Sequence, residues 1–205
     1  MHFDFLIFMS HHIYQTSGFI LGSSAFGEAN RSFRVLTRDL GLIRASAQGV
    51  RFLKSKLRYA ISDFSYCEFS LVRGQERWRV TGVSKHADLY NEFRQTPEIL
   101  LLFARVFSLL ERLLSGEEKN KKLFKYIEEA VLFARTKKLL APLSRNFEYI
   151  LVLRILSCLG YLGSSPDTAA FIESPFWSDE LLLKMESLTP KILGEINRSL
   201  KESQL

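Results

Sequence analysis

The residues best able to do chemistry in this chain are seven basic side chains gathered in one segment, residues 31–56. They stand at positions 31, 34, 38, 44, 51, 54 and 56, and Asp39 is the only acid among them. Arginine can hold a phosphate with two parallel hydrogen bonds, and lysine supplies a mobile point charge. A field of one sign attracts polyanions, because neutralised phosphates release their condensed counterions. The segment therefore predicts a polyanion-binding surface, with nucleic acid as the first candidate.

The charge of the whole chain is unevenly divided. Residues 1–86 hold 12 basic and 6 acidic side chains, whereas residues 87–205 hold 16 of each. The first part thus carries the entire net charge of +6. We predict a basic N-terminal part and an electrically balanced C-terminal part.

Short alternating runs must position the basic residues. The pattern predicts strands at 13–21, 31–37, 42–48, 66–72 and 77–83, with turns at 22–24, 38–41 and 73–76. Five short strands at this spacing are typical of a small antiparallel barrel. We expect an inward face made by Phe33, Val35, Ile43, Ala45 and Ala47. The opposite positions, which include Arg34, Leu36, Leu42 and Arg44, should then point outward.

After residue 86 the hydrophobic period becomes helical. Helices are predicted at 97–114, 120–140, 146–159, 178–188 and 190–200, the first opened by Thr96, Pro97 and Glu98. The resulting division is a barrel domain at 1–86 and an α-helical domain at 87–205, in the α+β class. No Pro/Gly-rich linker separates them, so we expect the two parts to pack together.

Candidate nucleic-acid contacts follow from this arrangement. Aromatic side chains nearby can stack on bases, and Phe52, Tyr59 and Tyr66 are the candidates, although Phe52 fits a core position better. The bland alternative is that the basic residues are only a solvated surface. The DNA-binding residues we predict are Arg34, Arg38, Arg44, Arg51, Lys54, Lys56 and Arg58.

Several classes of function find no support in the sequence. It contains no G-x-S-x-G, P-loop or G-x-G-x-x-G motif, so we expect neither an enzyme nor a cofactor. Cys67 and Cys158 lie far apart and predict neither a zinc site nor a disulfide, which fits a cytoplasmic protein. The pair Glu128-Glu129 is interpreted as ordinary solvated charge. No apolar run is long enough to span a membrane, and the first ten residues lack the basic start of a signal peptide.

Four motifs in order give residues 14–58 a resemblance to the bacterial DNA repair protein RecO family. They are GFIL at 18–21, FGE at 26–28, LTRDLG at 36–41 and GVRFLKS at 49–55. In the helical part, FEYILVLRILSCLGY at 147–161 is similar to a helix of that family. The family often carries a four-cysteine zinc motif after this Gly-Tyr step, but no cysteine follows Tyr161, so no zinc is expected.

The resemblance implies a five-stranded OB-fold barrel packed on a helical bundle. It also implies a non-enzymatic recombination mediator that binds single- and double-stranded DNA, anneals complementary strands and assists recombinase loading. The implied partners are RecR and the acidic C-terminal tail of the single-strand-binding protein, and the implied location is cytoplasmic and nucleoid-associated.

Two other functions share the same electrostatics. An RNA- or ribosome-associated OB-fold protein would prefer structured RNA to single-stranded DNA. An acidic-peptide-binding scaffold would bind an acidic tail tightly and bare DNA weakly.

Overall fold

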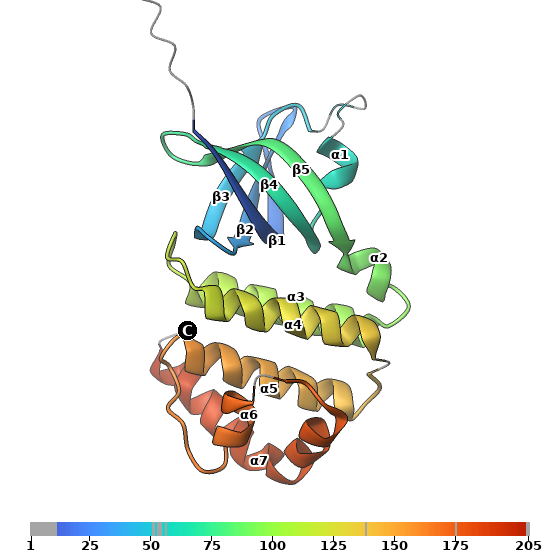
Figure 1. Ribbon diagram of the computed structural model, residues 1–205, viewed down its shortest axis with the longest axis vertical. Helices are drawn as coiled ribbons and strands as arrows, with labels where there is room; N and C mark the ends of the chain where they lie inside the picture. Colours follow the sequence, from blue (N-terminus) through green and yellow to red (C-terminus); the bar gives the residue numbers. More distant parts are fainter. Residues whose placement is uncertain are drawn as a thin grey trace, which may run out of the picture.

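The computed structural model describes residues 12–50, 52, 55, 57–137, 139–174 and 176–203, apart from the side chain of Phe26. A β-barrel stands on one face of a stack of helices (Figure 1). The helices α3 (Pro97–Leu113) and α4 (Lys121–Thr136) lie directly beneath the barrel. Beneath them lie α5 (Leu143–Cys158), α6 (Ala169–Glu173) and α7 (Asp179–Glu202). The expected combination of a barrel and a helical bundle is confirmed.

Five strands close the barrel in the order β1-β2-β3-β5-β4. Neighbours are antiparallel except β3 and β5, which run parallel and pair only at Ala45–Trp78 and Ser46–Arg79. A short helix, α1 (Leu57–Ala60), connects β3 to β4. This closure with a helix between the third and fourth strands is the OB-fold arrangement. The strands are β1 (Ile13–Phe26), β2 (Asn30–Thr37), β3 (Gly41–Ala47), β4 (Ser65–Arg73) and β5 (Trp78–Asp88).

The alternation of side chains that predicted β2 and β3 is present in the structure. Phe33, Val35, Ile43, Ala45 and Ala47 are all buried inside the barrel, whereas Arg34 and Arg44 are exposed on its outer face. An inward-facing apolar row and an outward-facing polar row are what a half-buried strand requires.

One predicted turn is wrong, because β1 does not end at residue 21. It continues through Gly22, Ser23 and Ser24 to Phe26. Its first half pairs with β4 and its second half with β2, and the register shifts between Ile20 and Gly22. A bulge of this kind bends a strand so that it can take part in two sides of a barrel. The small residues therefore mark a bend in a long strand, not a reversal of the chain.

The C-terminal end of the chain also differs from its prediction. We expected separate helices at 178–188 and 190–200, but α7 is one helix with Pro190 in its interior. Proline removes one backbone donor from the helix ladder. The Thr189 hydroxyl donates to the Met185 carbonyl at 2.9 Å, and Glu186, whose carbonyl loses its donor, is exposed to water. The helix thus passes through the proline without leaving a buried carbonyl unpaired.

The barrel and the helices share one apolar core. Phe19, Leu21, Leu36 and Ala87 of the barrel end belong to the same buried cluster as the inner faces of α3, α4 and α5. Leu36 points out of the barrel as predicted, yet it is buried because the helices cover it. Leu42 packs against the same cluster. A second cluster, which includes Phe33, fills the barrel interior. The expectation that the two parts pack together is confirmed.

Among the residues that the structure describes, no helix is both long and apolar enough to cross a membrane. The same residues contain no group of three or more His, Cys, Asp or Glu side chains placed to hold a metal ion.

Candidate nucleic-acid interface

The predicted DNA-binding residues lie in different surroundings. Arg34 and Arg44 face each other across β2 and β3 as register partners on the outer face of the barrel. Arg38 lies in the turn between these strands, next to the helices, and Arg58 lies in α1. Arg51, Lys54 and Lys56 lie outside the described residues.

Arg34 and Arg44 line a polar hollow of about 250 Å³. Its remaining walls are Gly22, Ser23 and Ser24 of β1 and Ser32 of β2. Two guanidinium groups beside three hydroxyls are donors suited to the oxygens of a phosphate, and none of the lining side chains is acidic. We name this feature the serine hollow.

A second polar hollow, of about 380 Å³, lies farther along the barrel and is lined by Ala25, Arg31, Val50, Arg58 and Ile61. Its Arg31 donates to Ser23 Oγ at 2.6 Å, which connects it to the serine hollow. Arg58, which lines this hollow, belongs to α1, and α1 lies on the part of the barrel away from α3 and α4 (Figure 1).

The exposed aromatic residues of the barrel include two from the predicted set. Phe52 is 63% exposed and Tyr59 is 76% exposed. The core position expected for Phe52 is therefore wrong, because the residue lies in the connection after β3 and not on a strand face. Among the described residues both rings are exposed, and stacking of a base on such a ring is the contact that sequence-tolerant single-strand binding uses.

Tyr66, the third aromatic candidate, is engaged in the junction with the helices. Its hydroxyl donates to Glu128 Oε1 at 2.6 Å, and its ring stacks on Phe19 with 4.5 Å between centroids. Burial, followed by the hydrogen bond to the Glu128 carboxylate, raises the pKa of Tyr66 to about 12. Its hydroxyl and one ring face already have partners within the protein.

Two of the predicted arginines form ion pairs with the helices. Arg38 Nη2 lies 2.7 Å from Glu128 Oε1 of α4, and its guanidinium lies over the Phe124 ring, 5.3 Å from the centroid. Arg34 Nε lies 2.5 Å from Glu111 Oε1 of α3. The interpretation of Glu128 as ordinary solvated charge is wrong, since it accepts from both Arg38 and Tyr66.

Other arginines of the barrel remain available. Within the described part of the chain, Arg44, Arg58 and Arg79 have no acidic partner within ion-pair distance. Arg79 is exposed on β5 and pairs in register with Ser46. Our sequence prediction missed it, although the alternation of Trp78, Arg79 and Val80 would have placed it outward. The three serines of the serine hollow could not be predicted as site residues, because nothing in their sequence pattern distinguishes them from small turn residues.

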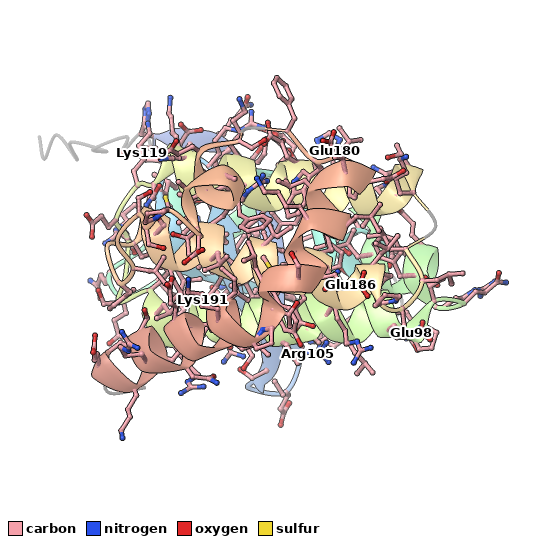
Figure 2. The ribbon with its side chains drawn as sticks, turned by 90° about the horizontal axis from the view of Figure 1, so that it is seen from below. Glu98, Arg105, Lys119, Glu180, Glu186 and Lys191 are labelled. Atoms are coloured by element: carbon pink, nitrogen blue, oxygen red, sulfur yellow. The ribbon has the colours of Figure 1, made fainter. Side chains whose placement is uncertain are left out.

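The helical part offers a contrast. Seen from the side opposite the barrel, it carries side chains of both signs, among them Arg105, Glu186 and Lys191 (Figure 2). Arg105 makes a two-pronged pair with Glu148, and Lys191 pairs with Asp167. The excess of positive charge therefore belongs to the barrel.

A closed five-stranded barrel with an arginine-bearing outer face and a helical part beneath one end defines an OB-fold protein. Comparison with known proteins shows which family the chain is similar to. Residues 9–84 match the family model described as "Recombination protein O N terminal", and the resemblance to the RecO family is confirmed.

Relatives extend the similarity into the helical part. The DNA repair protein RecO of Alkaliphilus metalliredigens is 29% identical over 152 residues, 74% of this chain and 59% of that protein. The protein of the same name from Dehalococcoides mccartyi is 44% identical over 71 residues, 35% of this chain and 28% of that protein. The protein of the same name from Rubrobacter xylanophilus is 29% identical over 131 residues, which cover 57% of this chain and 53% of that protein. The chain thus spans less than two thirds of each of these relatives.

Proposed function

We propose that this protein binds single- and double-stranded DNA without strong sequence specificity and acts in DNA repair as a recombination mediator. The observation that carries the proposal is that Arg44, Arg58 and Arg79 of the barrel have no acidic partner among the described residues, in a chain whose residues 9–84 match the RecO N-terminal model. Guanidinium groups that have no carboxylate partner favour a polyanionic ligand.

The chemistry of this surface favours contact with phosphates over reading of bases. Arg34, Arg44 and three serines surround the serine hollow, and such donors recognise phosphate oxygens, which are the same in every sequence. The exposed rings of Phe52 and Tyr59 add stacking, which every base can accept. Weak sequence preference is the expected result.

The finer parts of the proposal rest on the resemblance. Annealing of complementary strands, assistance in recombinase loading, RecR and the acidic tail of the single-strand-binding protein as partners, and a cytoplasmic, nucleoid-associated location all belong to the longer family members. They enter here as proposals, as do the domain division at residue 86 and the roles of Arg51, Lys54 and Lys56.

The test is fluorescence anisotropy of a labelled single-stranded DNA oligomer at several salt concentrations. With about 4–6 phosphates neutralised, log K should fall with log salt at a slope of about −3 to −4. Charge reversal at Arg44 and Arg58 should weaken binding far more than reversal at Lys184 and Lys201. These two lysines are exposed on α7 and have no ion pair among the described residues.

The same samples are then scored for annealing after the complementary strand is added. Acceleration of annealing together with salt-sensitive binding supports the mediator function. Equal effects of the two charge-reversal pairs would contradict the barrel interface. Stronger binding of a structured RNA competitor would favour the RNA-associated alternative instead.

A further inference from the structure

Two acidic side chains of the helical part hold arginines at the rim of the barrel face. Glu111, in the last turns of α3, binds Arg34 with 2.5 Å between Oε1 and Nε. Glu117, in the connection between α3 and α4, binds Arg73 of β4 and accepts from Trp78 Nε1 at 3.1 Å. Both carboxylates therefore occupy guanidinium groups next to the surface proposed to bind DNA.

Arg34 belongs to two adjoining hollows of opposite character. Together with Arg44 it lines the serine hollow, which has no acidic side chain. The same two arginines line a neighbouring hollow of about 300 Å³ whose walls include Glu76, Glu111 and Glu117. One side chain therefore borders both spaces, with the Glu111 carboxylate on one side of it and the serine hydroxyls on the other.

The absence of a side chain at Gly22 leaves room for the Arg34 guanidinium between the two hollows. A Cβ atom at Gly22 would lie 2.8 Å from Arg34 Nη2 and 3.4 Å from Glu111 Oε1. The guanidinium thus lies directly over the β1 backbone, between the serine hollow and Glu111. Any larger residue at this position would push the Arg34 head aside.

The ion pairs are exposed enough to be replaced. The side chain of Arg34 is 49% exposed, and that of Arg73 is 51% exposed. Solvent screens such pairs, so they hold their partners weakly compared with a polyanion that presents many phosphates at once. A polyanion that presents many phosphates is therefore able to displace these two carboxylates.

We propose that Glu111 and Glu117 compete with DNA phosphates for Arg34 and Arg73, so that the helical part lowers the DNA affinity of the barrel. This inference rests on the proposed function. It assigns to the helices a second role beside support of the barrel: each carboxylate stands in for a phosphate and is displaced when DNA binds.

The test uses Glu111→Gln and Glu117→Gln, which preserve side-chain size and remove one charge each. Each released arginine can take one more phosphate. Binding of the labelled single strand should then tighten by up to about fivefold per variant at 0.1 M salt, and the slope of log K against log salt should steepen by about 0.7. Far-ultraviolet circular dichroism checks that each variant is folded.

The matched control is Glu186→Gln, which removes the same charge from an exposed position on α7, away from the barrel (Figure 2). A second control adds Arg34→Gln to Glu111→Gln, which should cancel the gain. If the Glu111 and Glu117 variants behave like the Glu186 variant, the proposal is overturned while the proposed function stands. If the unaltered chain and all variants fail to bind DNA at any salt concentration, both are overturned.

Discussion

At the scale of single residues, the fate of each arginine depends on which acids lie beside it. Arg34 and Arg44 are register partners on the same outer face, yet Arg34 is held by Glu111 and Arg44 has no acidic partner in the described part of the chain. Arg38 is fixed by Glu128 and by the Phe124 ring. Exposure alone therefore does not identify the arginines that are available to the proposed DNA ligand; the positions of their carboxylate neighbours do.

Tyr66 supplies a prediction at this scale. Its pKa is about 12 in the folded protein and near 10 in the unfolded chain. Since the folded pKa is raised, the stability contributed by its hydroxyl is fully present below pH 10 and is lost as pH rises through 12. Tyrosinate absorbance at 295 nm is compared between the unaltered chain and Tyr66→Phe. The difference between the two curves should titrate near 12.

The control for Tyr66 is the same pair of proteins in concentrated guanidinium chloride, where the difference should titrate near 10. A folded-state difference that also titrates near 10 would mean that the Tyr66 hydroxyl is neither shielded from water nor bonded to Glu128.

At the scale of elements, the connection between α3 and α4 covers part of the β3 edge. Because β3 pairs with β5 at only two positions, its first residues present an open edge on that side. The Leu42 amide donates to the Gly116 carbonyl at 3.2 Å, and Gly41 lies against the Glu118 backbone. An uncovered strand edge invites pairing with other chains, so this connection also protects the barrel.

A pair of glycine substitutions measures this contact. Gly41→Ala and Gly27→Ala both place a side chain at positive φ, +75° and +64°. This strain costs about 1–2 kcal/mol in each. At Gly41 the new Cβ would also overlap the Glu118 carbonyl oxygen, whereas at Gly27 the nearest atom that the structure describes is Asn30 Nδ2, 3.9 Å away. Gly41→Ala should therefore lower the free energy of unfolding by about 1–3 kcal/mol more, as measured in urea. Equal losses of unfolding free energy in the two variants would show that the connection between α3 and α4 does not pack closely against Gly41.

At the scale of the whole molecule, the shared core makes the barrel and the helices depend on each other. Phe19 of β1 is fully buried, and its ring packs on Tyr66, Phe107 and Phe124 with centroids 4.5–6.2 Å apart. Residues of both parts therefore lose their apolar surroundings if either part unfolds. We expect one cooperative unfolding transition.

The two tryptophans allow a direct test, since Trp78 lies in the barrel and Trp177 in the helical part. In Trp177→Phe, fluorescence reports the barrel, and circular dichroism at 222 nm reports mainly the helices. The two urea transitions should coincide. Trp78→Phe provides the reciprocal measurement. A barrel transition at clearly lower urea than the helical one would show that the junction does not couple the two parts.

Much of the architecture could be read from local patterns. Alternation placed Phe33, Val35 and Ile43 inside the barrel, because one face of a strand must be apolar to be buried. The helical period located α3, α4 and α5 to within a few residues at most boundaries. The basic segment was equally visible, since charge is a property of the residues themselves.

Local patterns could not predict contacts between residues that are far apart in the sequence. Arg34 meets Glu111 across 77 positions, and Arg38 meets Glu128 across 90. Nothing in the local sequence distinguishes these acids from solvated ones. The same holds for Leu36, whose outward side chain becomes buried only when the helices dock on it. The sequence by itself therefore determined most of the elements and the sign of the surface charge. The tertiary structure decided where β1 and α7 continue past their predicted ends and which charges are already neutralised, because pairing depends on distances that only the folded chain sets.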